Sequence, residues 1–98
     1  MKTQQELGYA VHVLVCCNER ASGSCCSAVG GIDIYRALKQ WVMERGLARS
    51  VWVTRTGCLG FCNDVGVNVV IYPQGLWFLQ TTPQNLAHVH DTILRLVA

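Results

Sequence analysis

Residues 11–16, Val-His-Val-Leu-Val-Cys, decide the fold of this chain. The run is β-branched and nearly all apolar, which is typical of a β-strand covered on both faces, and it ends on a cysteine. Residues 16–31 contain four cysteines, three glycines and three serines, a composition that predicts a loop. Residues 32–45 then repeat apolar side chains at helical spacing, and residues 50–55 form a second strand-like run. A strand, a helix and a strand in this order predict a right-handed crossover between two parallel strands.

The second half of the chain predicts a hairpin and a final helix. Residues 67–72 and 76–80 are strand-like runs on either side of a Pro-Gln-Gly turn. Thr82 is suited to be an N-cap and Pro83 to occupy the first helical position, and apolar residues follow at helical spacing. The expected order is therefore β-α-β-β-β-α, an α/β fold with a four-stranded mixed sheet.

Length and composition limit the classes of function. The 98 residues, of which 51% are hydrophobic and 14% charged, are enough for one domain, with residues 1–10 as an N-terminal extension. Eight basic and six acidic residues give a net charge of +2 without charge runs, which argues against a nucleic-acid or membrane-surface binder. The N-terminus has no apolar signal region, so we expect a cytoplasmic protein, in which clustered cysteines serve metal or redox chemistry.

The cysteines fall into two groups that the predicted topology brings together. Cys16 ends the first strand and Cys58 follows the second, so both loops leave the carboxyl edge of the sheet. Cys58 and Cys62 form a C-x3-C pair, and Cys16 forms the other pair with either Cys25 or Cys26. Four thiolates suit tetrahedral zinc or an iron–sulfur cluster. The spacings are wider than the x2 spacing of most zinc ribbons, which favours the cluster.

Several runs of this sequence resemble the thioredoxin-like 2Fe-2S ferredoxins. They share their residue types and their order with that family, and they are residues 13–20, 26–31, 56–62, 69–78 and 82–86. The resemblance implies a thioredoxin-like two-layer α/β sandwich. It also implies a one-electron carrier, not an enzyme, with one 2Fe-2S cluster held by four cysteines.

Carried onto this chain, the resemblance gives ligand roles to Cys16, Cys58 and Cys62. The fourth ligand is Cys26 when residues are counted back from the glycines before the helix, and Cys25 when they are counted forward. We favour Cys26, because the distance to the helix is fixed whereas the preceding loop varies in length. Cys17 is expected to be a small buried apolar residue.

The resemblance also implies partners and leaves two rival functions. The expected partners are redox proteins and a second copy of this chain, which would pack through the hairpin at Trp77 and Phe78. One rival is a structural zinc domain. The other is a thiol–disulfide oxidoreductase, which usually places C-x2-C at the first strand-to-helix junction, whereas this chain has two vicinal cysteine pairs there.

Overall fold

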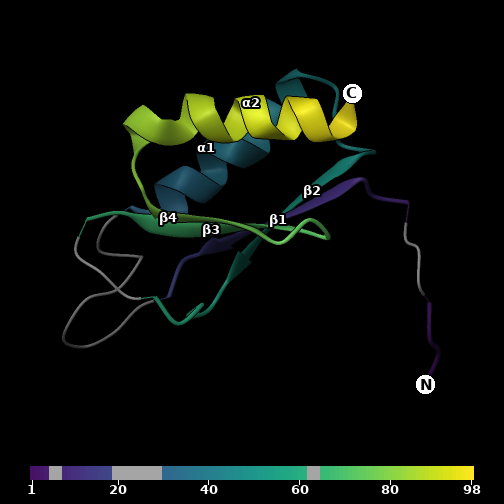
Figure 1. Cartoon of the computed structure of the whole chain (residues 1–98), viewed down its shortest axis with the longest axis horizontal. Helices are drawn as coiled ribbons and strands as arrows, with labels where there is room; N and C mark the ends of the chain where they lie inside the picture. The colour runs from purple at the N-terminus through teal and green to yellow at the C-terminus, as the bar shows by residue number, and fades with distance from the viewer. Residues whose placement is uncertain (5–7, 19–29, 62–64) are drawn as a thin grey trace.

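The computed structural model describes residues 1–4, 8–18, 30–61 and 65–98. Its elements follow the predicted order and are drawn in Figure 1. They are β1 (Val11–Cys16), α1 (Gly31–Glu44), β2 (Val51–Thr56), β3 (Val67–Tyr72), β4 (Leu76–Thr81), the short 3-10 helix η1 (Pro83–Asn85) and α2 (Leu86–Val97).

The four strands form one mixed sheet in the spatial order β2-β1-β3-β4. β1 and β2 are parallel, with Val11 opposite Val51 and Cys16 opposite Thr56. β3 is antiparallel to both β1 and β4, and the turn between β3 and β4 is closed by the bond from Gly75 N to Ile71 O, 2.8 Å. The predicted crossover and hairpin are thus confirmed.

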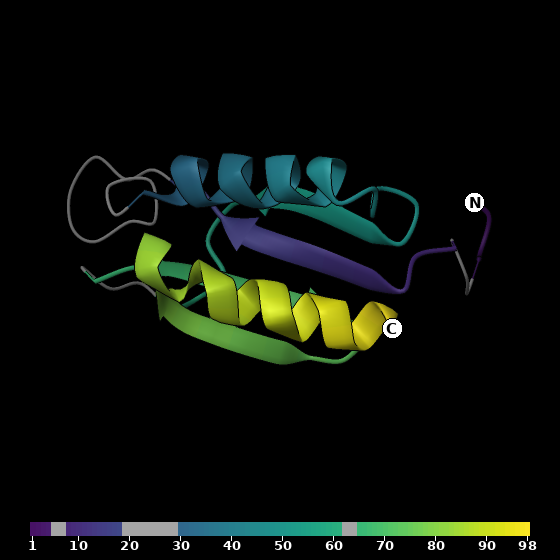
Figure 2. The same cartoon turned by 90° about the horizontal axis from the view of Figure 1, so that it is seen from above.

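Both helices lie on the same face of the sheet, which makes the domain a two-layer sandwich. Figure 2 shows α1 running along β1 and β2 and α2 along β3 and β4. One hydrophobic core fills the space between the layers, because alternate strand residues and one stripe of each helix point into it. Its largest fully buried helix residues are Ile34, Leu38 and Ile93, all at positions that the helical spacing predicts.

Local signals account for the ends of the helices. α1 stops in a Schellman motif: Gly46 has φ +67°, its N–H donates to Met43 O at 3.1 Å, and Leu47 N–H donates to Val42 O at 2.9 Å. Ahead of α2, the backbone N–H and the hydroxyl of Thr82 each donate to Asn85 Oδ1 at 2.9 Å. α1 begins at Gly31, one residue before the start that the periodicity predicts. The short 3-10 helix η1 precedes α2.

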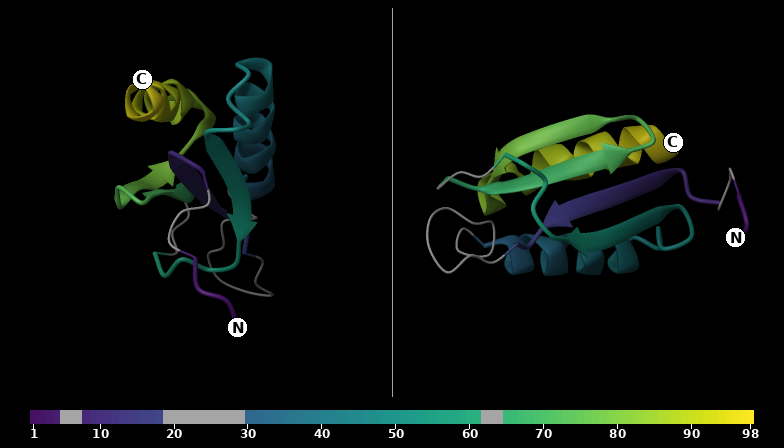
Figure 3. Two further views of the ribbon diagram at one scale, coloured as in Figure 1. Left: turned by 90° about the vertical axis from the view of Figure 1, so that its right-hand side faces the viewer. Right: turned by 90° about the horizontal axis from the view of Figure 1, so that it is seen from below.

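No helix of the described residues lies on the other face of the sheet, as the right panel of Figure 3 shows. The expectation that β1 would be covered on both faces is therefore wrong: His12 on this face is half-buried. The cover comes from neighbouring side chains, because Trp52 stacks on His12 at 5.5 Å between ring centroids and Tyr9 stacks on Trp52 at 4.4 Å. Trp52 remains 45% exposed and Trp77, further across the same face, 41%. Among the described residues, no helix is long and apolar enough to cross a membrane.

Candidate metal centre

Cys16 is fixed by the sheet itself. It is the last residue of β1, it lies opposite Thr56 in the parallel ladder, and it is only 2% exposed. The ladder continues one residue further, because Cys17 N donates to Thr56 O at 2.9 Å. The position of this thiol is thus set by strand pairing, as the topology predicts.

The second cysteine loop begins at the same edge. A Cβ built on Gly57 would lie 4.0 Å from Asn18 Oδ1, so the segments after β1 and β2 approach each other. Cys58 is exposed and follows two residues after β2. Gly60 N donates to Cys58 Sγ at 3.3 Å, and Gly60 has φ +98°, a conformation that favours glycine. The structure therefore supplies a backbone N–H donor to one of the predicted ligand sulfurs.

Leu59 and Phe61 within this loop point to different surroundings. Leu59 is half-buried and packs against the hydrophobic core. Phe61 is 54% exposed, and its ring meets the Trp77 ring edge-on at 5.5 Å between centroids. Leu59 thus attaches the loop to the core, and Phe61 attaches it to the hairpin.

Asn68 is a site residue that the sequence analysis missed. Its side chain is 1% exposed, and its Nδ2 donates to Phe61 O at 2.6 Å. The signal in the sequence was a single amide within the apolar run Val67-Asn68-Val69-Val70-Ile71. Such a residue in a buried strand requires a hydrogen-bond partner.

Cys17 is half-buried rather than fully buried, and it packs against the core as a small apolar residue. Its Sγ donates weakly to Val15 O at 3.6 Å. Burial raises the pKa of the Cys17 thiol, and the neighbouring Cys16 raises this pKa further, while Arg55 acts in the opposite direction. The raised pKa and the packing against the core suit a structural role beside the site rather than a ligand role.

The donor chemistry at this edge fits a thiolate-bound metal group. Cys16 and Cys58 are the predicted ligands that the structure describes, whereas Cys62, Cys26 and its alternative Cys25 lie outside the described residues. Within the described ranges, no group of three or more His, Cys, Asp or Glu side chains gathers as a metal site. Soft thiolates favour iron–sulfur clusters or zinc, and an N–H on a ligand sulfur stabilises its negative charge.

The histidines lie in other parts of the fold. His12 Nε2 is 2.8 Å from Thr54 Oγ1 on the open sheet face. His88 meets the Phe78 ring edge-on at 5.7 Å, and His90 stacks on Trp41 at 4.1 Å between centroids with an interplanar angle of 2°. Each of the three rings thus packs against an aromatic side chain.

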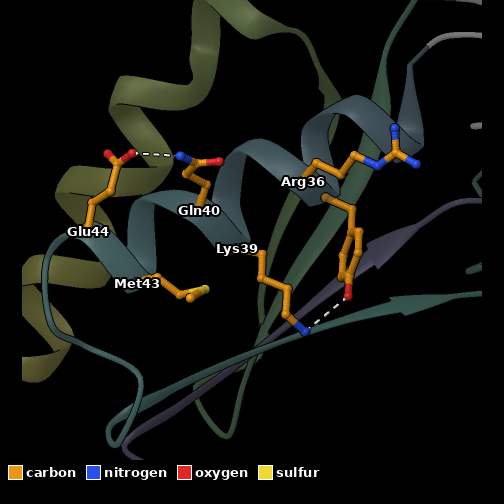
Figure 4. A pocket seen from close by; sticks show the side chains of 6 residues that line it. Arg36, Lys39, Gln40, Met43 and Glu44 are labelled. Atoms are coloured by element: carbon orange, nitrogen blue, oxygen red, sulfur yellow. Dashed lines mark hydrogen bonds between the residues drawn. The ribbon is translucent and has the colours of Figure 1, made fainter.

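A shallow pocket lies on the outer side of α1 (Figure 4). All six residues that line it belong to that helix, and they include Arg36, Lys39 and Glu44. Lys39 Nζ donates to Tyr35 OH at 3.2 Å, and Gln40 Nε2 donates to Glu44 Oε1 at 2.9 Å. A pocket walled by one helix surrounds a molecule on one side only, unlike the enclosed clefts of most small-molecule sites.

The fold is that of a small α/β protein in which Cys16 ends β1 and Cys58 follows two residues after its parallel neighbour β2. No family model matches the chain. A 2Fe-2S ferredoxin of Clostridium pasteurianum is 30% identical over 84 residues, which cover 83% of this chain and 81% of that protein. A 2Fe-2S ferredoxin of Aquifex aeolicus is 28% identical over 88 residues, covering 86% and 78%.

Solved structures agree with the sequence matches. The crystal structure of the wild-type thioredoxin-like [2Fe-2S] ferredoxin of Aquifex aeolicus superposes with a TM-score of 0.77 at 27% identity, covering 89% of this chain and 87% of that one. A further structure of a thioredoxin-like [2Fe-2S] ferredoxin from this organism gives a TM-score of 0.76 at 28% identity, covering 88% and 81%. The chain belongs to the thioredoxin-like [2Fe-2S] ferredoxin family. Homology to 2Fe-2S ferredoxins implies an electron carrier rather than an enzyme.

Proposed function

We propose that this protein carries single electrons on one 2Fe-2S cluster held by Cys16, Cys26, Cys58 and Cys62. The observation that carries the proposal is the convergence of the segments after β1 and β2, with Gly60 N–H already directed at Cys58 Sγ. The cluster, when bound, supplies the redox chemistry, and the protein supplies ligation, burial and hydrogen bonds to sulfur.

The ligand assignment rests on two further lines of support. Two of the solved Aquifex structures are variants in which serine replaces one of two cysteines four positions apart, the same separation as Cys58 and Cys62. Counting back from the start of α1 assigns the fourth ligand position to Cys26.

Four thiolates and an oxidised 2Fe-2S core together would change the formal charge of the protein from +2 to zero, and one electron would bring it to −1. These are small net charges for a soluble domain.

The residues around the cysteines then have separate tasks. Strand pairing holds Cys16, the Gly60 N–H stabilises the charge on Cys58, and Leu59 excludes water from the core side of the loop. A carrier of this kind needs a donor and an acceptor, so redox partner proteins are part of the proposal.

Anaerobic purification followed by metal analysis and spectroscopy tests the function. We expect two irons and two sulfides per chain, an oxidised state that is silent in EPR, and a paramagnetic signal after uptake of one electron. A colourless protein with stoichiometric zinc would instead establish the structural zinc domain. A metal-free chain with a reversible disulfide would establish a thiol–disulfide oxidoreductase.

A further inference from the structure

Asn68 occupies an unusual place for an amide side chain. It lies on β3 between Val67 and Val69, both fully buried, and it is itself 1% exposed. Removing an amide from water costs free energy unless its hydrogen bonds are replaced. Asn68 is not part of the hydrophobic core cluster to which Val67 and Val69 belong, and its buried amide requires a hydrogen-bond partner.

That partner is the backbone of the second cysteine loop. Asn68 Nδ2 donates to Phe61 O at 2.6 Å, and Phe61 directly precedes Cys62 in the chain. The pairing of β3 with β4 is irregular at the same point: Val67 lies opposite Thr81 and Val69 opposite Phe78, so β4 contains one extra residue across from Asn68.

Two further contacts attach this loop to the hairpin. The ring of Phe61 lies edge-on against Trp77 of β4. Gly66, where the chain returns from the loop, has no room for a side chain, because a Cβ there would lie 2.5 Å from the backbone of Gln80 and Thr81. Phe61 and Gly66, which precede and follow Cys62 in the sequence, therefore both contact the hairpin.

The second polar atom of the Asn68 amide is its carbonyl oxygen, Oδ1. Asn68 Oδ1 is buried, and no donor among the described residues reaches it. The Nδ2 of Asn68 thus holds the cysteine loop, while its Oδ1 is buried in the same part of the fold. An amide so placed serves the geometry of the loop rather than general stability, since an apolar residue would pack a strand interior at less cost.

We propose that Asn68 is a positioning residue of the cluster site. By holding the carbonyl of Phe61, it keeps the C-x3-C loop in the conformation in which Gly60 N–H donates to Cys58 Sγ, and it thereby sets the reduction potential and the retention of the cluster. This inference rests on the proposed function.

The test compares Asn68→Leu with Asn68→Thr and with a matched control, Thr81→Val. The Leu side chain is similar in size to that of Asn and lacks both of its polar atoms. The Thr side chain is favourable in a β-strand but is too short to reach Phe61 O. Thr81 is also a buried polar residue, at 2% exposure, and its Oγ1 donates to Phe78 O at 3.2 Å, a hydrogen bond within β4. The Thr variant keeps the experiment decisive if the Leu variant does not fold.

Three quantities are measured on each holoprotein: cluster release to a chelator, the reduction potential and thermal stability. We expect both Asn68 variants to release the cluster about two- to tenfold faster, the factor that one lost hydrogen bond supplies, and to have a more negative potential. Thr81→Val should lose stability and keep the wild-type release rate and potential. Asn68 variants that match Thr81→Val in release rate and potential would overturn the proposal.

Amide exchange at Gly60 in the metal-free protein separates this inference from the proposed function. Faster exchange in the Asn68 variants than in Thr81→Val supports the anchoring role even if the wild-type protein binds zinc. Equal exchange refutes the anchoring role, whatever metal the protein holds.

Discussion

Replacing Gly60 by alanine should shift the reduction potential of the cluster through a single hydrogen bond. Gly60 has φ +98°, and a Cβ built on it meets no atom of the described residues within 4 Å. The penalty therefore comes from the backbone conformation alone, which costs an L-residue about 1–2 kcal/mol. The loop can escape that cost by rotating Gly60, and this rotation withdraws its N–H from Cys58 Sγ, now 3.3 Å away.

The magnitude follows from the strength of that bond. A hydrogen bond to a charged acceptor contributes about 1.5–3 kcal/mol. One added electron is shared over the cluster, so only part of this energy, about 0.5–1.5 kcal/mol, differs between the two oxidation states. For a one-electron couple, in which about 59 mV corresponds to a tenfold change, this is a shift of about 20–60 mV. The sign is negative, because the lost donor stabilises the reduced, more negative state.

A redox titration followed by absorption measures the shift. The matched control is Gly57→Ala in the same loop. The backbone of Gly57 is not left-handed, and among the described residues its Cβ would meet only Asn18 Oδ1 at 4.0 Å. Gly57→Ala should keep the wild-type potential, and Gly60→Asn should fall between, because asparagine tolerates positive φ better than alanine. A fully loaded Gly60→Ala protein with the wild-type potential would refute the reasoning.

Further changes test other parts of the structure. Cys26→Ser should alter the absorption and EPR spectra while Cys25→Ser leaves them unchanged, and the reverse result would assign the ligand to Cys25. Gly66→Ala should lower the free energy of unfolding in denaturant by about 1–3 kcal/mol, because its Cβ would overlap the backbone of β4; an unchanged midpoint contradicts this contact. Burial lowers the pKa of His90, so the unfolded chain binds more protons at this residue than the folded chain does. The free energy of unfolding should therefore fall as the pH drops below about 6.5. His90→Gln should flatten this pH dependence, and an unchanged curve would assign the dependence to other groups. If two copies pair through the hairpin, Trp77→Lys should convert the sedimenting species from dimer to monomer, whereas a wild-type monomer at every concentration rejects the pairing.

The sequence predicted the elements well because each carries its own local signal. The helical spacing of Ile34, Leu38 and Val42 places α1 within one residue, and Gly46 marks its end. The convergence of the loops after β1 and β2 follows from the handedness of the crossover, which depends on topology and not on any particular side chain.

Tertiary placement was harder to predict, because it depends on residues distant in sequence. The apolar run of β1 predicts cover on both faces, yet both helices pack on one, and the aromatic cluster around Trp52 partly replaces the missing layer. The stacking of His90 on Trp41 joins two helices that no local pattern relates. Asn68 gave a visible signal, but its partner lies seven residues earlier in a loop without periodicity.

The two predicted ligands that the structure describes, Cys16 and Cys58, obtain their positions in different ways, and this difference determines how the site responds to change. Cys16 is part of a strand in the middle of the sheet, so its position is as rigid as the core. Cys58 lies on an exposed loop that gains its order from the hairpin, through Asn68 and through the Trp77 ring that packs against Phe61. The geometry of metal ligands is most precise when helices or strands hold them. The loop of Cys58 contains neither, and its contacts with the hairpin hold it in place. Changes on β3 and β4 should therefore alter the cluster more than equally disruptive changes on α1, although α1 follows the first cysteine loop directly in the sequence.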